Sequence, residues 1–468
     1  MLYLSWRNRR GAHDLRKSAL RPLPVARAQR DALYRFIPMI YRVLIMKKIL
    51  RRTPLGLAVA LSSTQLFASG FALNEQSISG MGSGFAGRSS SAEDASTVFG
   101  NPAGMSRLKK EQASVGAATL FAKAHISQTR STFGGQEDGD MVPTTTVPMG
   151  YYVKPIDEHW AFGVGFYVPF GLMTDYGSGF AGRYYANKSE VTTLTFQPTI
   201  SYAFNDKVSI GFGPTINRIS GELSGMVLNP LSPGRNDGKL KSTGDDTALG
   251  FNAGILVQAT DRTRLGLTYH SKVSYRLDAK TKLTDGIFSV LGVSGTSYDA
   301  SLDVDTPESV DFSVTHQLNS DWTLYLGSTW TRWSRFKELV FENSGLPAAL
   351  SGTLSRITEE QNWHDTWAHA IGTAYKLNNQ WVLRAGFSVD QSPANNVNRG
   401  PRIPTGDRKV ISVGAGWTPA VNVTIDVAYS YLWEESVQVN DVSASRGAYS
   451  SKYKNSASGL GTSVSYRF

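Results

Sequence analysis

The stretch ISVGAGWTPAVNVTIDVAYSY, residues 411–431, decides the fold. Apolar side chains stand at every second position on both sides of a short turn at Thr418–Asn422, and the positions between them are mostly small or polar. The apolar positions are Ile411, Val413, Ala415, Trp417, Ile425, Val427, Tyr429 and Tyr431. Because successive side chains of a β-strand point to opposite faces, this period of two predicts two antiparallel strands that share one apolar face.

The same alternation recurs beyond Glu111, and the connections between strands separate a membrane barrel from a soluble β-sandwich, which alternates too. Short turns are expected at Lys154–His159, Asn205–Lys207, Thr260–Thr263, Gln317–Asp321, Lys376–Gln380 and Thr418–Asn422. Long polar connections are expected at 127–143, 169–190, 224–246, 277–297, 342–362, 390–407 and 433–456. Short and long connections take turns, as in a barrel with short periplasmic turns and long outer loops. Six short and seven long connections predict fourteen strands.

Two further features bear on the strand count and on assembly. Pro307 interrupts residues 298–316, which we interpret as one strand with a bulge, since two strands would put the termini on opposite sides. The last strand alternates up to the aromatic carboxy-terminal residue Phe468. This ending resembles the terminal strand that the barrel assembly machinery of the outer membrane recognises, so Phe468 is expected to be the assembly signal.

Length, charge and cysteine content set the remaining bounds. The 468 residues suit one large barrel, and no stretch approaches the roughly 20 apolar residues of a spanning helix. Cysteine is absent, so neither disulfides nor thiolate metal sites are expected. Residues 1–52 hold 14 of the 48 basic and 2 of the 38 acidic residues, which leaves 34 basic and 36 acidic residues beyond them. The formal charge of +10 therefore gives no evidence for a nucleic-acid partner.

The amino terminus has the pattern of a secretory signal peptide. Residues 46–52 are rich in Lys and Arg, Leu55–Leu61 is apolar, and small residues follow at 68–70. We therefore expect the signal peptide, 46–68, to be removed by cleavage after Ala68 or Gly70. Residues 1–45 are interpreted as an extension upstream of the true start at Met46, with a long basic region as the alternative. A short amphipathic helix of a cytosolic protein is the competing interpretation of the leader.

A segment of small residues, 69–110, separates the leader from the barrel at 111–468. It is too polar and irregular to face lipid, and irregular backbone at membrane depth is tolerated only inside protein or beside water. A fourteen-stranded barrel has a lumen that its own side chains cannot fill. We therefore predict that 69–110 is a hatch that plugs the lumen, with a disordered periplasmic tail as the alternative.

Several motifs in order resemble the FadL/TodX family of outer-membrane transporters for long-chain fatty acids and hydrophobic compounds. Residues 69–75, SGFALNE, with Asn101-Pro102-Ala103 resemble the family's amino-terminal hatch. Residues 329–336, TWTRWSRF, resemble its Trp-Ser-x-Phe strand, and 390–408 resemble its Asp-x-Ser-Pro and Pro-x-x-(Asp)-Arg loop. The resemblance covers essentially 69–468 and implies an all-β outer-membrane barrel of a Gram-negative bacterium.

The resemblance also implies a route for a hydrophobic molecule: capture on outer loops, a lumenal site, hatch movement and lateral exit. Phe71 matches a residue that lines the family's pocket. The candidates for capture lie in loop 169–190, which is unusually apolar: Pro169, Phe170, Leu172, Met173, Tyr176, Phe180, Tyr184 and Tyr185. Val227, Leu228, Pro230 and Leu231 are the candidate partner surface, while an interfacial aromatic girdle is the competing explanation for the loop aromatics.

A fatty-acid carboxylate needs a cationic partner when it is buried. Arg218 matches the strand position of the family's binding arginine, but strict alternation puts Arg218 on the lipid parity with Phe212 and Ile216. Either a bulge turns Arg218 inward or it sits above the membrane. The family's second cation falls near Val340 here, so Lys337 or Arg335 is the candidate replacement, and uncharged aromatic hydrocarbons are an alternative substrate.

Other classes of protein receive little support. The seven histidines are scattered, and neither a phosphate loop nor a nucleophile elbow occurs, so no enzyme, metal or cofactor is expected. A general porin or adhesin, with the hatch segment not a plug, is the alternative, and an outer-membrane lipase lacks a triad. The expected partners are a hydrophobic small molecule, outer-membrane lipid and lipopolysaccharide, and the assembly machinery, around a monomer.

Overall fold

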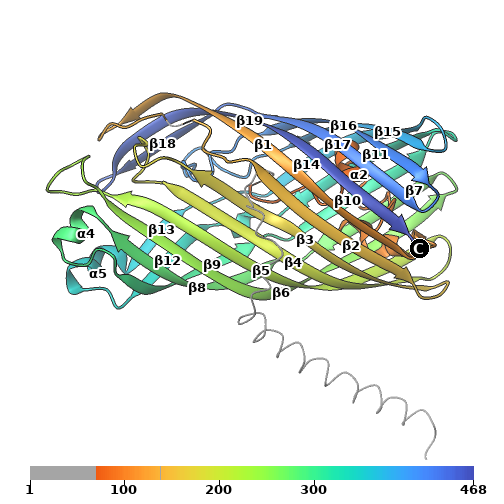
Figure 1. Ribbon diagram of the computed structural model, residues 1–468, viewed down its shortest axis with the longest axis horizontal. Helices are drawn as coiled ribbons and strands as arrows, with labels where there is room; N and C mark the ends of the chain where they lie inside the picture. The colour runs from red at the N-terminus through yellow and green to blue at the C-terminus, as the bar shows by residue number, and fades with distance from the viewer. Residues whose placement is uncertain (1–69, 138) are drawn as a thin grey trace, which may run out of the picture. The chain divides into compact units, whose positions relative to one another are not determined.

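The computed structural model describes residues 70–137 and 139–468, and these form an antiparallel β-barrel around an internal segment (Figure 1). The barrel closes because the first and last strands pair along most of their length, from Gln112 opposite Arg467 to Ser131 opposite Tyr449. The strands are β1 (Gln112–Ser131), β2 (Thr145–Pro155), β3 (Trp160–Asp175), β4 (Lys188–Ala203), β5 (Val208–Val227), β6 (Gly238–Thr260), β7 (Thr263–His270), β8 (Val273–Thr284), β9 (Ser297–Thr306), β10 (Ser309–Gln317), β11 (Trp322–Thr331), β12 (Glu338–Ser344), β13 (Arg356–Glu360), β14 (Thr366–Lys376), β15 (Trp381–Asp390), β16 (Arg408–Ala420), β17 (Val423–Glu434), β18 (Val437–Ser443) and β19 (Gly447–Arg467).

Nineteen strand segments make fourteen crossings because five crossings are interrupted. The interrupted crossings are β7 with β8, β9 with β10, β11 with β12, β13 with β14, and β17 with β18. Pro307 and Glu308 separate β9 from β10, and both segments continue to pair with the same neighbouring crossing, formed by β7 and β8. The predicted all-β, fourteen-stranded barrel and its single strand at Pro307 are therefore confirmed. Proline removes one ladder donor, which accounts for a break at this point.

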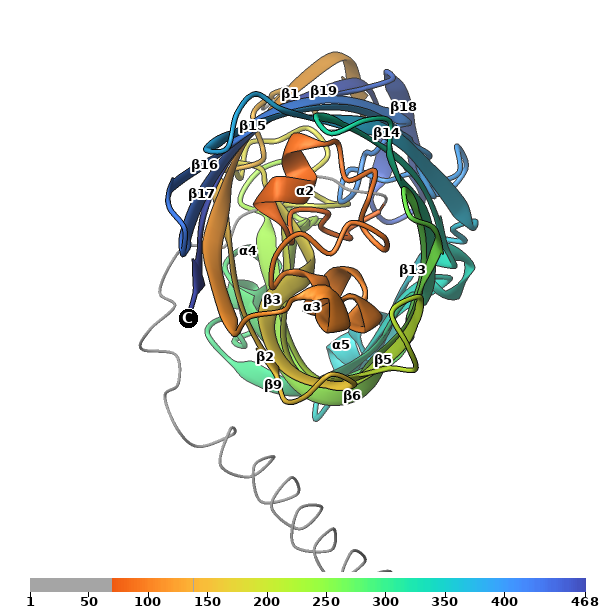
Figure 2. The same cartoon turned by 90° about the vertical axis from the view of Figure 1, so that its right-hand side faces the viewer.

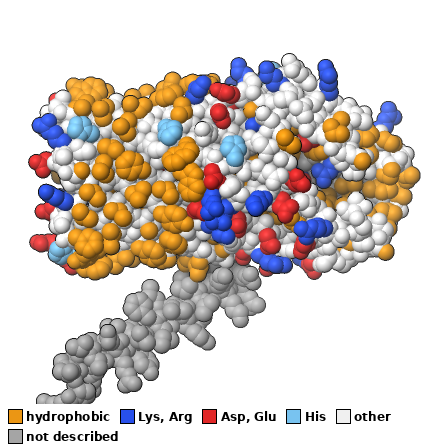
Figure 3. Space-filling model, turned by 180° about the vertical axis from the view of Figure 1, so that it is seen from behind, with side chains coloured by type: hydrophobic (Ala, Val, Ile, Leu, Met, Phe, Trp, Pro, Cys, Tyr) orange, Lys and Arg blue, Asp and Glu red, His pale blue; other side chains and the backbone are white. Residues whose placement is uncertain are grey.

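The outer face of the barrel carries an apolar belt at the end with the short turns (Figure 3). Trp160, Trp322, Trp381 and Trp417 stand beside the short turns, and Trp367 and Tyr431 lie further along their strands. Beyond the belt, toward the long loops, the outward side chains become charged, as at Lys280 and Asp299. The strict alternation therefore gives a lipid-facing band, and the strands continue past it into water.

The long loops of the structure are shorter than the sequence pattern predicted, so the predicted loop bounds were wrong. The expected loop 224–246 is only residues 228–237, because β5 and β6 extend and pair from Val227 opposite Gly238 onward. The expected loop 433–456 is mostly the hairpin of β18 and β19. Strands above the apolar belt are polar on their outward face, so alternation of hydrophobicity does not reveal them.

The hatch lies inside the barrel (Figure 2). It contains the short helices α2 (Ile78–Gly82) and α3 (Thr97–Gly100) and the 3-10 helix η2 (Pro102–Arg107). Wall glycines allow its backbone to approach closely: a Cβ on Gly327 would lie 2.5 Å from the Ala86 carbonyl oxygen, and one on Gly386 would overlap Ser83. Residues 70–110 therefore form the predicted plug, and their backbone contacts the lumenal face of the barrel wall.

The remaining helices are short. Helices α4 (Gly286–Val290) and α5 (Ala348–Leu354) lie in long-loop connections, and η3 (Trp333–Arg335) lies between β11 and β12. Among the described residues, no helix has the length and hydropathy that a spanning helix requires. The predicted extension 1–45 and signal peptide 46–68 lie outside the described residues.

Candidate functional site

The barrel wall has a gap between β2 and β3. The two strands pair only from Gly150 opposite Phe166 to Pro155 opposite Ala161, so the half of β3 nearer the long loops has no β2 partner. The pairing of β3 with β4 also shifts register between Tyr167 and Phe170, where Pro169 follows Val168. A proline and a register shift bend the strand, and this bend moves β3 away from β2.

The beginning of the hatch occupies this bend. Ala72 forms an isolated antiparallel bridge with Phe170. The Leu73 amide donates to the Pro169 carbonyl at 2.8 Å, and the Gly171 amide donates to the Phe71 carbonyl at 2.7 Å. The Gln76 side chain adds a hydrogen bond of 2.6 Å to the Val168 carbonyl. Residues 71–73 thus act as a short strand that completes the wall where β2 has departed.

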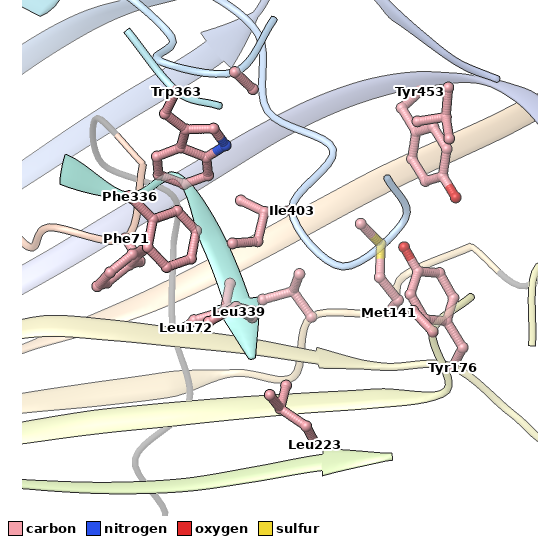
Figure 4. Packing of buried hydrophobic residues seen from close by; sticks show 14 of the residues in the cluster. Phe71, Met141, Leu172, Tyr176, Leu223, Phe336, Leu339, Trp363, Ile403 and Tyr453 are labelled. Carbon is pink, nitrogen blue, oxygen red and sulfur yellow. The ribbon is translucent and has the colours of Figure 1, made fainter. Parts of the chain in front are cut away.

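Phe71 packs in an aromatic cluster with Phe336 and Trp363 (Figure 4). Trp333 and Phe170 belong to the same cluster. The centroid of the Phe71 ring lies 4.8 Å from that of Trp333 and 5.4 Å from that of Phe336, both with edge-to-face geometry. Edge-to-face pairs add about 0.5–1.5 kcal/mol each beyond the burial of area. Phe71 is only 4% exposed, so it is a packed stopper.

An apolar cavity adjoins Phe71 on the side of the long loops. Leu172, Leu223, Leu339 and Ile403 contribute to its lining (Figure 4). The complete lining is Phe71, Leu172, Val191, Ile219, Gly221, Leu223, Ser242, Thr243, Gly244, Leu277, Ala279, Leu302, Val304, Phe336, Leu339, Phe341, Gln361, Arg402 and Ile403. These side chains come from several strands and from loop 391–407, which therefore folds inward over the lumen.

A row of small residues leaves the space for this cavity. Gly221 of β5 pairs with Gly244 of β6, and Gly244 pairs with Ala279 of β8. Since all three line the cavity, the wall there is hardly thicker than backbone. Larger residues at these directly opposed positions would fill the interior, because cross-strand neighbours lie about 5 Å apart.

Arg402 is the one charged side chain among the described residues that line the apolar cavity. Its Nε and Nη2 donate to the two carboxylate oxygens of Glu359 at 2.7 and 3.0 Å. Its Nη1 makes longer contacts with the Ser224 carbonyl at 3.2 Å and the Ser189 hydroxyl at 3.2 Å. Burial alone would raise the pKa of Glu359, which lies on β13 beyond the apolar belt, but the Arg402 guanidinium holds this pKa below its usual value.

A second cavity, with a mixed polar and apolar lining, begins directly after the stopper. Ala72, Leu73, Asn74 and Glu75 line it from the hatch, directly after Phe71 in the chain. The bend of β3 contributes Tyr167, Pro169 and Phe170 to the lining. Polar and charged residues elsewhere in the wall complete it, including Asp311, His270 and Arg408. The hatch thus lines both the apolar cavity and a second cavity of mixed lining that adjoins the bend of β3.

The rest of the hatch is fastened to the wall. Asn101 caps η2 by accepting from the Ala103 amide at 3.0 Å, and its Nδ2 donates to the Ser89 carbonyl at 2.7 Å and to the Ile255 carbonyl of β6 at 3.0 Å. The motif Asn101-Pro102-Ala103 therefore positions the hatch.

A charged group fastens a second point of the hatch. Glu93 pairs with Arg384 of β15 at 2.9 Å, and Arg384 also pairs with Asp426 of β17 at 2.8 Å. Buried ion pairs of this kind leave an uncompensated charge when one partner is removed.

The structure brings some predicted site residues together and separates others. Phe71 and Leu172 line the apolar cavity, and Phe170 lies beside the stopper. Met173, the neighbour of Leu172 in β3, has the opposite strand parity and is half-buried. Phe180 is fully buried, with its ring stacked 4.0 Å from that of Tyr176.

The expectation that loop 169–190 exposes its aromatic side chains is therefore wrong. Residues 169–175 belong to β3, and Tyr176 and Tyr184 are buried like Phe180. Of the partner surface, Leu231 is 69% exposed. Composition alone could not reveal this burial, because the same apolar loop can either fold back onto the barrel mouth or lie exposed to water.

The predicted cations lie outside the cavity. Arg218 points outward, just beyond the apolar belt, where its guanidinium pairs with Asp245 at 3.1 Å. Alternation thus holds at Arg218: of the two alternatives, the bulge is absent from this stretch of β5, and Arg218 lies above the apolar belt. Lys337 is exposed, and Arg335 pairs with Glu308. Sequence analysis missed Arg402, whose signal is a lone arginine in the apolar run Pro401–Pro404.

A closed barrel with an outer apolar belt, an internal hatch and an apolar cavity defines a class of protein: a plugged outer-membrane transporter. This chain matches the family described as outer membrane protein transport protein (OMPP1/FadL/TodX) over residues 59–468. This chain belongs to that family and is an outer-membrane protein.

Relatives and solved structures agree with this assignment. The long-chain fatty acid transport protein of Escherichia coli O6:H1 is 28% identical over 453 residues, which cover 90% of this chain and 99% of the relative. The crystal structure of a Pseudomonas aeruginosa FadL homologue has 26% identity and a TM-score of 0.78, and the match covers 85% of this chain and 100% of that chain. The Pseudomonas putida toluene transporter TodX, at 20% identity and a TM-score of 0.61 over 80% of this chain and 94% of that chain, shares the fold.

Proposed function

We propose that this protein carries long-chain fatty acids inward across the outer membrane. The observation that carries the proposal is the position of hatch residues 71–75: Phe71 lines the apolar cavity, and Ala72 to Glu75 line the second cavity beside the wall gap. Similarity to long-chain fatty acid transport proteins supports this choice of substrate.

The route follows from the contacts. An acyl chain gains about 0.8 kcal/mol for each methylene group it buries, so the apolar cavity can hold it without any covalent chemistry. A shift of residues 71–73 would withdraw Phe71 and uncover the bend of β3 together. The molecule then leaves sideways into the membrane, which spares an alkyl chain a passage through water. Loops at the mouth of the barrel, including exposed Leu231, are the capture surface in this proposal.

Uptake of radiolabelled oleate tests the proposal in a Gram-negative host that lacks its own transporter. Cells that carry this protein should accumulate oleate several-fold faster than cells with the empty vector. Uptake at the vector level, with folded barrel in the outer membrane, refutes the proposed function. Toluene uptake in the same cells tests the second candidate, an aromatic-hydrocarbon channel, which is favoured by a cavity whose one lining cation is already paired.

Several other expectations belong to this proposal. The protein works without covalent catalysis, as a monomer, with outer-membrane lipid and lipopolysaccharide around the belt. Phe468 acts as the assembly signal; it is 64% exposed, and its ring lies 4.9 Å from that of Tyr466. The hatch remains in place at rest, in contrast to an open porin.

A further inference from the structure

Arg402, which lines the apolar cavity, is paired with a carboxylate, the same group that a fatty acid carries at its head. Glu359 offers both carboxylate oxygens to Arg402 in the two-pronged geometry that any free carboxylate can adopt. The side chains of Arg402 and Glu359 are 12% and 14% exposed, so the pair is largely desolvated. A charge-assisted hydrogen bond in such surroundings is stronger than one in water.

We propose that Arg402 is the headgroup-recognising residue of the apolar cavity, and that a fatty-acid carboxylate replaces Glu359 on its guanidinium. This inference rests on the proposed function and adds the residue that selects an anionic amphiphile over an uncharged hydrocarbon. Glu359 occupies the position of the headgroup when no ligand is bound. Arg218, the arginine that alignment with the family suggests, lies on the opposite side of the wall.

The guanidinium is held in place independently of Glu359. Its Nη1 contacts the Ser224 carbonyl and the Ser189 hydroxyl, on the ends of β5 and β4. The backbone just before it is held as well, since the Tyr176 hydroxyl donates to the Pro401 carbonyl at 2.7 Å. Arg402 can therefore exchange one carboxylate for another while it keeps its position.

The exchange keeps the charge of Arg402 compensated. An incoming carboxylate makes the same two hydrogen bonds that Glu359 gives up, so Arg402 remains compensated. The released Glu359 stays in the field of a second cation, Arg446, which favours its ionised form. Ile403, next to Arg402, and Leu339 would contact the first methylene groups of the ligand, since both line the cavity.

The test compares two ligands of equal chain length, oleate and oleyl alcohol, on the purified full-length protein in lipid nanodiscs. Affinity is measured by calorimetry for the wild type, Arg402→Gln, Arg402→Lys and Glu359→Gln. The matched control is Arg218→Gln, which makes the same substitution at an arginine on the outer face. The quantity of interest is the ratio of the oleate affinity to the oleyl alcohol affinity.

We expect Arg402→Gln to lower this ratio at least tenfold, Arg402→Lys to lower it less, and Glu359→Gln to raise it because the competing carboxylate is gone. Arg218→Gln should leave it unchanged. Equal losses for both ligands would overturn the inference, because Arg402 would then only hold the loop; an unchanged ratio in both Arg402→Gln and Glu359→Gln would overturn it too. If Arg402→Gln does not fold, Glu359→Gln decides alone. Failure of the wild type to bind either ligand would instead refute the proposed function.

Discussion

Ala72 of the hatch and Phe170 of β3 face each other as an antiparallel pair, flanked by hydrogen bonds from Leu73 to Pro169 and from Gly171 to Phe71. This places them at a non-hydrogen-bonded position, where opposed Cα atoms lie about 4.5 Å apart. That separation falls within the range that a disulfide tolerates. The chain has no cysteine of its own, so an engineered pair would form a single defined link.

The first prediction is that Ala72→Cys with Phe170→Cys locks the hatch to the wall. Oxidised cells should lose most oleate uptake, and a membrane-permeant reductant should restore it, because the link prevents residues 71–73 from leaving β3. Each single variant is the control for the loss of Ala72 or Phe170 itself. Full uptake with a demonstrated disulfide would show that this segment does not move.

The second prediction concerns the stopper. Phe71→Ala should open a path between the two cavities, since the ring lines the apolar cavity and the next residues, Ala72 and Leu73, line the second cavity. The dissociation rate of a bound fluorescent fatty acid should rise about tenfold, which corresponds to roughly 1.4 kcal/mol of lost barrier. Phe288→Ala is the matched control, because Phe288 is also buried but lies in α4, away from both cavities. A rate equal to that of the wild type would remove Phe71 from the path.

The third prediction uses the small-residue row. Ala279→Leu should fill the apolar cavity from the wall that Gly221, Gly244 and Ala279 share. Oleate binding should fall by about tenfold or more, while octanoate, which needs less depth, should lose less. Ala448→Leu, at an exposed position at the beginning of β19, controls for the added bulk. Equal losses for both acids would contradict a limit on depth.

The fourth prediction concerns the fastening of the hatch. Arg384→Met should leave the buried Asp426 and the partly exposed Glu93 without their cation, and the loss of a buried pair costs roughly 3–5 kcal/mol. The hatch should loosen, and the conductance of single channels in planar bilayers should become larger and fluctuate. Lys280→Met breaks the exposed pair with Asp299, worth at most about 1 kcal/mol, and should leave the conductance at its resting level. An Arg384→Met channel as quiet as the wild type would place the fastening elsewhere.

Much of the fold was predictable because the alternation of apolar residues and the turn residues between strands are local features of the sequence. The run at 411–431 appears as β16 and β17, with Ile411 opposite Tyr431 and Trp417 opposite Ile425. Loop lengths were less predictable, because strands that continue above the apolar belt carry polar residues on their outward face, as at Gln438 and Asn440 of β18.

The candidate site divides in the same way. Phe71 and Leu172 were predicted from the hatch motif and from an apolar run, and both line the cavity. Met173 and Phe180 came from the same run, but one has the opposite parity and the other packs against Tyr176. Composition of a run does not state which of its members face a cavity.

A barrel with an apolar exterior and a separate hatch of small residues could be predicted from the sequence alone. Period-two alternation and local composition require no knowledge of contacts between distant residues. Only the tertiary structure decided that Arg402 enters the apolar cavity, that Arg218 stays outside, and that the hatch completes the wall at Phe170. The physical reason is that these depend on inward folding of loop 391–407 and on a register shift in β3. Both arise from contacts between residues far apart in the chain.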